Sequence, residues 1–440
     1  MAAERIAVVG GGLLGLQLAR RLAQRGRQVT VFEAADRAGG LAAPAAIGSF
    51  RWDRFYHVIL LSDLHTRGLL GDLGLAEHLR WGVTRTGFYT DGRMHSLSTN
   101  LEFLTFRPLS LVDKARLALT ILRAAAIRDG RPLEGVSVES WLRRWSGDRV
   151  YEKIWLPLLK SKLGENHRLA SASFIWAIIA RMYAARRAGL KREMFGYVDG
   201  GYELVLQRLQ AAVQEAGVQL VTGARVEDVR DTGQGAEIRL ADGAVQAFDH
   251  VVLTLPTPQI ARMLPQLPGA ERARLDGVTY QGIVCASVLL RRPLGPYYVT
   301  NITDPGAPFT GVIEMTALVD PAQFGGHALV YLPRYLAQDD AFWLKDDAEV
   351  REEFLTALAR MYPGFERADV LAFEVSRARF VLAVATLDYT ARHAPPVATS
   401  LERVSVLNSA QIINGTLNVN ETLAVAESGL EMLEQRLTRP

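Results

Sequence analysis

The chain has 440 residues, of which 49% are hydrophobic and 22% charged, with 50 Lys and Arg against 47 Asp and Glu. This length and composition favour an ordinary soluble globular protein of two domains with ample core. The net charge of +3 is too small to indicate a nucleic-acid-binding protein, and the single cysteine, Cys285, excludes internal disulfides.

The first predicted element is a short buried strand over residues 6–9, where every side chain is apolar. It begins within five residues of the N-terminus, which leaves no room for a signal peptide. No uninterrupted apolar run in the chain reaches membrane-spanning length. We therefore expect a cytoplasmic protein.

A glycine-rich turn follows this strand and leads into a predicted helix over residues 13–25. The first glycine permits a tight turn, the next lets a pyrophosphate approach the backbone, and the last lets the helix pack on the strand. The free N–H groups and positive dipole end of the helix favour phosphate binding. The residues expected to bind a dinucleotide here are Gly10, Gly12, Leu13, Leu14 and Gly15.

A second predicted strand, over residues 29–33, ends at Glu33. A carboxylate at this position of a dinucleotide-binding unit accepts hydrogen bonds from ribose hydroxyls. The glycine pair Gly39–Gly40 follows, and this additional element points to FAD rather than NAD.

Residues 33–41 (EAADRAGGL) resemble the extended FAD fingerprint of the flavin amine oxidase, protoporphyrinogen oxidase and carotenoid desaturase superfamily. The resemblance implies an α/β fold, in which a Rossmann-type FAD-binding domain is interleaved with an α+β substrate domain. The fingerprint usually ends in Gly-Gly-Arg or Gly-Gly-Leu, and because Leu41 stands here, Arg37 is expected to supply the phosphate contact. The cofactor-binding residues implied are Glu33, Ala34, Arg37, Gly39, Gly40 and Leu41.

The segment 51–57 follows the glycine pair at the spacing where family members run past the flavin. Asp53, Phe55, Tyr56 and His57 are therefore expected to border the flavin ring. The near-neutral pKa of histidine makes His57 a candidate for proton handling. A hydrogen-bonded structural histidine is the alternative interpretation.

Residues 85–195 are rich in helix signals, with helices predicted at 109–128 and 140–155. The basic helix at 109–128 is expected to cover the substrate domain, and peripheral contact with a membrane is the alternative. Lys160 and Lys162 lie in one short segment, and one of them is a candidate anion contact in the substrate pocket. Solvated lysines are the alternative.

Further matches to the family lie between residues 200 and 256. The Gly200–Gly201 turn resembles the family's return to the nucleotide domain, and strands are predicted at 218–221 and 224–229. A hairpin is expected at Asp242–Gly243. In the family, the valine at the position of Val226 offers its backbone to adenine, and the strand before Pro256 lies beneath the cofactor. The cofactor-binding residues implied are Val226, Thr254 and Pro256.

Alternating apolar and polar residues between 283 and 375 predict the sheet of the substrate domain. Cys285 lies in an apolar run and is expected in the core. Candidates to line a cavity over the flavin are Phe309, Glu314, Tyr331, Arg334 and Tyr335, with Tyr335 a catalytic candidate alongside His57.

The last matching segment is 404–421, followed by a helix to about residue 437. Asn418 with Glu421 three residues later fits a helix N-terminal cap. In the family, this helix aims its positive end at the flavin, which favours the anionic reduced ring. An acidic residue that usually binds the ribityl chain is missing, and Asn408 or Gln411 is expected to replace it. The cofactor-binding residues implied are Asn408, Leu417, Asn418 and Asn420.

These observations divide the chain into two interleaved domains. Residues 1–80, 196–282 and 376–440 are assigned to FAD binding, and residues 83–195 and 283–375 to substrate binding. The expected function is an FAD-dependent oxidoreductase that passes hydride from an amine, a porphyrinogen-like compound or a polyene to flavin N5. Oxygen or another acceptor then reoxidises the flavin.

With no cysteine near the C-terminal segment, FAD is expected to be held noncovalently. The scattered histidines predict no metal site. We expect a small-molecule substrate and no nucleic-acid partner, and the sequence predicts no oligomeric state.

Two other functions remain open. Residues 55–65 are faintly similar to the His-rich segment of UDP-galactopyranose mutases, which rearrange a sugar nucleotide on reduced FAD without net redox change. In the third interpretation the flavin is structural and the protein is a scaffold or carrier.

Overall fold

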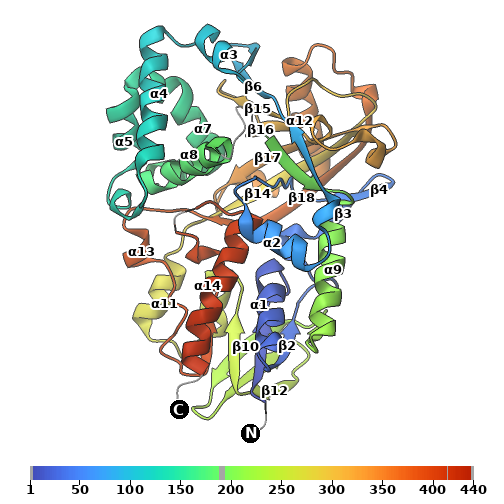
Figure 1. The fold of residues 1–440 in the computed structure, drawn as a ribbon, viewed down its shortest axis with the longest axis vertical. Helices are drawn as coiled ribbons and strands as arrows, with labels where there is room; N and C mark the ends of the chain where they lie inside the picture. Colours follow the sequence, from blue (N-terminus) through green and yellow to red (C-terminus); the bar gives the residue numbers. More distant parts are fainter. Residues whose placement is uncertain (1–2, 188–193, 414, 438–440) are drawn as a thin grey trace.

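The computed structural model describes residues 3–187, 194–413 and 415–437, arranged as two lobes joined at a waist (Figure 1). The lower lobe is built on a five-stranded parallel sheet with the strand order β19-β13-β1-β2-β9. Both ends of the described chain lie at the bottom of this lobe (Figure 1). The strands are β1 (Arg5–Val9), β2 (Gln28–Phe32), β9 (Gln219–Val221), β13 (His250–Leu253) and β19 (Val404–Val406).

The parallel sheet is covered on both faces, which explains why its central strands read as continuous apolar runs. One face carries three helices, α1 (Leu13–Gln24), α9 (Gly201–Glu215) and α14 (Val419–Leu437). The other face carries α10 (Thr257–Met263), α11 (Gly269–Asp276) and an antiparallel sheet. The strands of that sheet are β10 (Val226–Asp231), β11 (Ala236–Leu240) and β12 (Val245–Phe248).

The upper lobe contains a seven-stranded sheet with the order β18-β14-β17-β16-β15-β6-β7. Its longest strands pair antiparallel, and Ile283 of β14 lies opposite Tyr335 of β17. Helix α12 (Asp347–Met361) packs on one face of this sheet. The strands are β6 (Thr86–Thr90), β7 (Arg93–Ser96), β14 (Tyr280–Leu290), β15 (Val299–Ile302), β16 (Gly311–Glu314), β17 (Ala328–Leu336) and β18 (Val370–Ala383).

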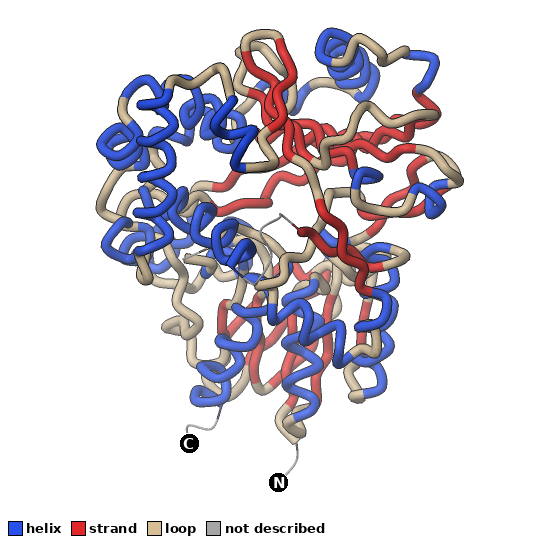
Figure 2. Tube along the Cα trace, turned by 45° about the horizontal axis from the view of Figure 1, so that its top comes forward, coloured by secondary structure: helices blue, strands red, loops and turns tan. Residues whose placement is uncertain are grey.

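Helices gather on the other side of the upper lobe (Figure 2) around a core of large apolar side chains. The helix expected over residues 140–155 is interrupted at Gly147, whose φ of +80° ends one helix and begins another. The helices are α3 (Asn100–Thr105), α4 (Leu111–Ala126), α5 (Val138–Ser146), α6 (Asp148–Val150), α7 (Leu156–Leu163) and α8 (Ala172–Arg187), with a π-helical turn at Tyr151–Trp155.

Smaller elements connect the lobes. They are the hairpin β3 (Pro44–Ile47) and β4 (Phe50–Asp53), the antiparallel pair β5 (Leu79–Val83) and β8 (Met194–Val198), α2 (Leu64–Asp72) and α13 (Tyr389–Arg392). Within the described ranges, no helix has the length and apolar character needed to cross a bilayer.

The predicted fold class is confirmed, because a parallel sheet with helices is joined to a mixed lobe of helices and sheet. Several details differ from the sequence expectations. Residues 86–96 form strands rather than helix, and residues 347–361 form α12 inside the region expected to be sheet. The expected domain limits after residues 282 and 375 fall inside β14 and β18, which run unbroken through them.

Candidate active site

The turn between β1 and α1 forms a cradle whose shape depends on its glycines. A side chain at Gly10, where φ is +114°, would place Cβ 2.4 Å from the hydroxyl oxygen of Thr254. A Cβ on Gly15 would lie 1.9 Å from the carbonyl oxygen of Gly10, so the helix can approach the strand only without a side chain there. In contrast, a Cβ on Gly12 would meet only the Cα of Gly40, at 3.9 Å. Open space therefore lies in front of Gly12.

The second glycine pair packs directly against this turn. The N–H of Gly39 donates to the carbonyl of Gly11 at 2.8 Å, and a Cβ on Gly40 would lie 3.1 Å from the Cα of Gly12. Both Gly39 and Gly40 have positive φ values, which favour glycine. The two glycine segments thus form one continuous backbone wall beside the first turn of α1.

A positive charge that the sequence analysis did not single out lies beside this wall. Arg54 donates from its guanidinium to the carbonyl of Gly40 at 2.7 Å, while its buried Nε–H has no partner within the described part of the chain. Burial lowers the pKa of Arg54. Arg37, the residue expected to contact phosphate, is exposed. A diphosphate placed over Gly12 would meet the free N–H groups of the α1 terminus and the charge of Arg54.

Glu33 closes the cradle at the end of β2. One carboxylate oxygen accepts the N–H of Gly11 at 2.8 Å, and the other accepts the N–H of Ala35 at 2.8 Å. Each oxygen has a second lone-pair direction, which remains available to a ribose hydroxyl. Ala34 and Leu41 flank this region, exposed and half-buried respectively.

Side chains from the C-terminal half of the chain brace the cradle. The hydroxyl of Thr254 donates to the carbonyl of Val9 at 2.9 Å, and Pro256 begins helix α10. Asn408 donates to the carbonyl of Leu255 at 2.7 Å and accepts the N–H of Ala410. The side chains of Asn408 and Gln411 are thus engaged with backbone groups, and Val226 is buried in the core below the sheet.

Helix α14 begins at the waist and runs down to the bottom of the lower lobe (Figure 1). Asn418 accepts the N–H of Glu421 at 3.0 Å, which is the predicted N-terminal cap. Asn420, a predicted cofactor residue, accepts the N–H of His65 and so ties α14 to α2. Leu417 is half-buried against the core of the helical part. The cap directs the positive end of α14 toward the waist.

Side chains from both lobes meet at the waist. Tyr56 shares a hydrogen bond of 3.0 Å with Tyr335 of β17. Asp53 is buried, accepts the N–H of Tyr202 at 2.8 Å, and lies 3.5 Å from Nδ1 of His57. The structure therefore places His57 and Tyr335 in the same region, on either side of Tyr56.

Burial controls the ionisation of these groups. It raises the pKa of Tyr56 to about 12 and that of Tyr335 well above its usual value. Both phenols are therefore neutral near pH 7 and act as hydrogen-bonding groups rather than as bases. The carboxylate of Asp53 lies close to the His57 ring without a hydrogen bond to it, because Nδ1 of His57 has no hydrogen-bond partner among the described residues. Since imidazole is a common proton acceptor in enzymes, His57 stays the candidate for that role.

The remaining candidates are dispersed. Phe309 and Cys285 are buried core residues, and Arg334 donates to the carbonyl of Pro308. Burial raises the pKa of Glu314 to about 7, and its oxygens accept hydrogen bonds from Leu294 and Thr316. Tyr331 donates to the carbonyl of Asp53 and so braces the waist. Among the residues the structure places, no three His, Cys, Asp or Glu side chains are grouped as metal ligands.

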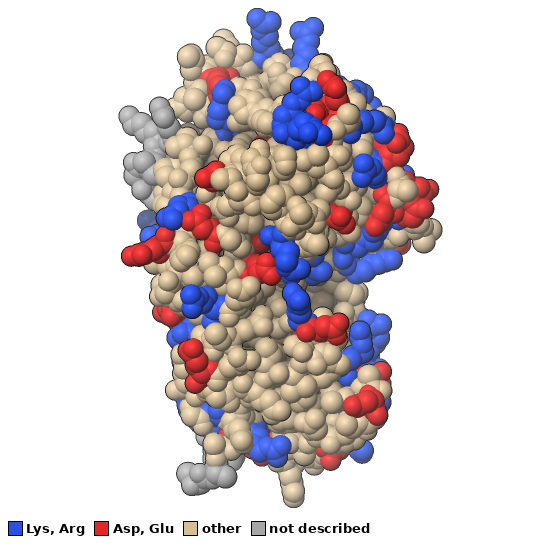
Figure 3. All heavy atoms as spheres, turned by 90° about the vertical axis from the view of Figure 1, so that its right-hand side faces the viewer, with Lys and Arg blue, Asp and Glu red and all other residues tan. Residues whose placement is uncertain are grey.

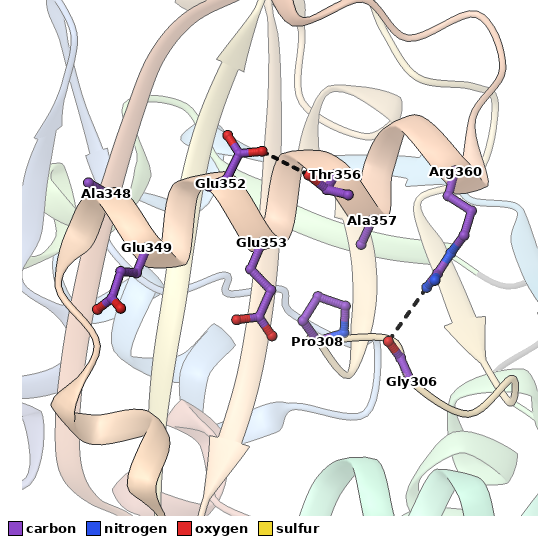
Figure 4. A pocket seen from close by; sticks show the side chains of 9 residues that line it. All are labelled: Gly306, Pro308, Ala348, Glu349, Glu352, Glu353, Thr356, Ala357 and Arg360. Atoms are coloured by element: carbon purple, nitrogen blue, oxygen red, sulfur yellow. Dashed lines mark hydrogen bonds between the residues drawn. The ribbon is translucent and has the colours of Figure 1, made fainter.

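A cavity of about 620 Å³ lies elsewhere, beside α12 in the upper lobe (Figure 4). It is lined by one side of α12 and by the loop that contains Gly306 and Pro308, with Glu349, Glu352 and Glu353 among its side chains. None of the residues expected to bind cofactor or substrate lines it. A separate hollow at the waist, with Lys or Arg side chains beside it, is visible from the side in Figure 3.

Residues 15–398 match the family model of the flavin containing amine oxidoreductases, which covers most of the chain. The chain belongs to this family. A coproporphyrinogen III oxidase from Mycobacterium leprae is 27% identical over 287 residues, which are 61% of this chain and 63% of that protein. The chain therefore matches just under two thirds of that relative's length.

Solved structures share the fold. A protein described as a protoporphyrinogen oxidase from Exiguobacterium sp. 255-15 superposes with a TM-score of 0.79 at 18% identity, covering 99% of both chains. A reduced UDP-galactopyranose mutase superposes with a TM-score of 0.75 at 15% identity, covering 99% of this chain and 97% of the other. At these identities the likeness shows the fold alone.

Membership of the flavin containing amine oxidoreductases confirms FAD as the cofactor and places the protein among FAD-dependent oxidoreductases. The chain's own residues fit this cofactor: an open cradle at Gly12, a first turn of α1 without a side-chain cap and an arginine with an unpaired N–H. Sequence reasoning missed Arg54. Arg54 follows the β3–β4 hairpin directly, and its position indicates a cofactor contact only when the structure shows that Arg54 reaches Gly40. The individual cofactor contacts remain predictions.

Proposed function

We propose that the protein oxidises a porphyrinogen-like substrate, taking hydride from carbon to FAD bound at the waist. The observation that carries the proposal is the row formed by Tyr56, Tyr335 and Lys162, which leads from the segment after the glycine pair into the upper lobe. This row is aromatic and cationic. It therefore suits neither a cationic amine, which Lys162 would repel, nor an apolar polyene. The name of the Mycobacterium leprae relative favours a tetrapyrrole precursor.

The chain's residues have three tasks in this reaction. The neutral tyrosines hydrogen-bond and orient the substrate, while the surrounding apolar residues exclude water. His57, which lies beside Asp53, accepts the proton that leaves a pyrrole nitrogen when hydride leaves a methylene carbon that bridges two pyrrole rings. FAD, held noncovalently, supplies the two-electron acceptor at N5 and passes the electrons on to oxygen or another acceptor.

Anaerobic mixing of the FAD-loaded protein with candidate substrates tests the proposal. We expect coproporphyrinogen III to bleach the flavin's yellow colour, and putrescine and phytoene to leave it unchanged. The variant His57→Gln should bind FAD normally but bleach more slowly, about a hundredfold if proton transfer limits the step. Bleaching by the amine or the polyene, without bleaching by the porphyrinogen, contradicts the proposal.

Sugar-nucleotide rearrangement is the second candidate, supported by the shared fold of the mutase and by the faint similarity of residues 55–65. It requires prior reduction of the flavin and consumes no electrons. Conversion of UDP-galactopyranose by the dithionite-reduced protein, without bleaching by any porphyrinogen, would establish it instead.

Location and partners also stay predictions. Helix α4 packs on α5 and α8 through one side, as a helix covering the upper lobe should. Its other side exposes Leu111, Val112, Leu119 and Leu122, with Arg116 and Arg123 between them. Such a side suits peripheral contact with a membrane, and a cytoplasmic location remains an expectation.

A further inference from the structure

One ammonium group lies inside the upper lobe without a counter-charge. Lys162, in the last turn of α7, places its Nζ 3.7 Å from the ring centroid of Tyr335. Across residues 3–187, 194–413 and 415–437, no carboxylate lies within ion-pair distance of it. Burial lowers the pKa of Lys162 to about 7. An unpaired ammonium in such a place is costly unless it loses its proton or meets an anion.

The position of Lys162 suggests which way the amine points. The residue lies deep within the protein, yet its side chain retains accessible surface, as do Tyr56 and Tyr335. The side chains of Lys162, Tyr56 and Tyr335 are therefore deep in the protein without being sealed from solvent. Lys160, two residues earlier on the same helix, is exposed on the outside.

The helix that carries Lys162 is held against the sheet. Helix α7 packs on β17, and the hydroxyl of Thr310 donates to the carbonyl of Ser161 at 2.8 Å. The helix ends at Gly164, where φ is +53°. The C-terminal end of a helix supplies only a fraction of a negative charge, so it does not replace a counter-ion. The amine is thus fixed beside the two tyrosines.

We propose that Lys162 binds a carboxylate of the substrate, with Tyr335 forming the adjacent wall of the subsite. This inference rests on the proposed function for the identity of the substrate. A single ammonium balances a single carboxylate, whereas a phosphate is held in proteins by several donors or by a bidentate arginine. Arg54 is a separate cation, bonded to the carbonyl of Gly40 at the glycine pair, whereas Lys162 lies over Tyr335.

Binding of unreactive carboxylates to the FAD-loaded protein tests this subsite. The probes are benzoate, followed by perturbation of the flavin absorbance, and coproporphyrin III with its tetramethyl ester, followed by porphyrin fluorescence. We expect Lys162→Met to weaken binding of both acids about tenfold to a hundredfold and to leave the ester unchanged. Lys162→Arg should restore most of the affinity, and Lys160→Met should match the wild type.

Unfolding curves of each variant exclude a folding defect, since loss of an unpaired buried charge should not lower stability. The proposal is overturned if Lys162→Met weakens the binding of acid and ester equally, or weakens the binding of neither. It is also overturned if the wild type binds neither acid. If porphyrinogen fails to bleach the flavin but the binding of benzoate still depends on Lys162, the carboxylate subsite is supported and the proposed substrate is wrong.

Discussion

The two lobes treat polar groups in different ways. In the lower lobe, the cradle is made of backbone: Gly10, Gly12 and Gly15 shape it, and Glu33 is bonded to two N–H groups. In the upper lobe, ionisable side chains are buried inside: Glu314 accepts two hydrogen bonds there, and burial moves the pKa values of Lys162 and Glu314 to about 7. A backbone cradle suits a cofactor common to a family, whereas side chains that vary freely suit a substrate particular to one member.

The strongest way to test the backbone cradle compares two glycines of the same turn. Gly15→Val should prevent folding or destabilise the protein by about 4 kcal/mol or more, because its Cβ would overlap the carbonyl of Gly10. Gly12→Val should fold, since its φ of −72° and ψ of 175° accept any residue and its Cβ meets open space. It should nevertheless lose FAD affinity about a hundredfold.

Urea unfolding of the apoprotein, followed by FAD titration, separates the two effects. If Gly12→Val binds FAD as the wild type does, the diphosphate does not lie over Gly12 and the assigned cradle is wrong.

The second test concerns the one histidine inside the parallel sheet. His250 lies 2.9 Å from the hydroxyl of Ser405, and burial lowers its pKa to about 3. The pKa of His250 in the folded protein is below the unfolded value of about 6.5. Between these two pH values the unfolded chain therefore binds a proton at His250 and the native protein does not. The contribution of neutral His250 to the free energy of unfolding is complete above pH 6.5. This contribution falls by about 1.4 kcal/mol per pH unit as the pH is lowered toward 3.

His250→Gln should therefore flatten the acid side of the stability profile, measured by urea unfolding over a series of pH values. His78→Gln, at an exposed histidine, should leave the profile of the wild type. If the free energy of unfolding of His250→Gln falls with pH as steeply as that of the wild type, His250 does not cause the loss of stability in acid.

The smallest expected effect lies at the waist, where the lobes meet. Asn418→Ala removes the cap of α14 and should cost about 1 kcal/mol of unfolding free energy. Asn418→Asp keeps the acceptor and should stay near the wild type. Because the cap also orients the positive end of the helix, the alanine variant should lower the flavin reduction potential slightly, as spectroelectrochemical titration would reveal.

The sequence predicts features that depend on neighbouring residues, but not contacts between distant segments. The glycine turn, the first helix and strand, the Asp242–Gly243 hairpin and the Asn418 cap all depend on local chemistry, and the structure has each of them. The contact of Lys162 with Tyr335 joins segments far apart in the chain, through the packing of α7 on β17. No local pattern distinguishes Lys162 from Lys160. For the same reason the sequence did not predict the contact of Arg54 with Gly40, or the hydrogen bond by which Asn420 joins α14 to α2.

The order of strands in the lower lobe has a consequence for how the protein is made. The first strand is flanked by β13, which in turn pairs with β19, and the first helix packs against α14. The ribosome synthesises β1, α1 and β2 long before β13, β19 and α14, which complete the sheet and its helical cover. The lower lobe therefore reaches its full fold only after translation has passed residue 400, and until then the cofactor cradle lacks part of its support.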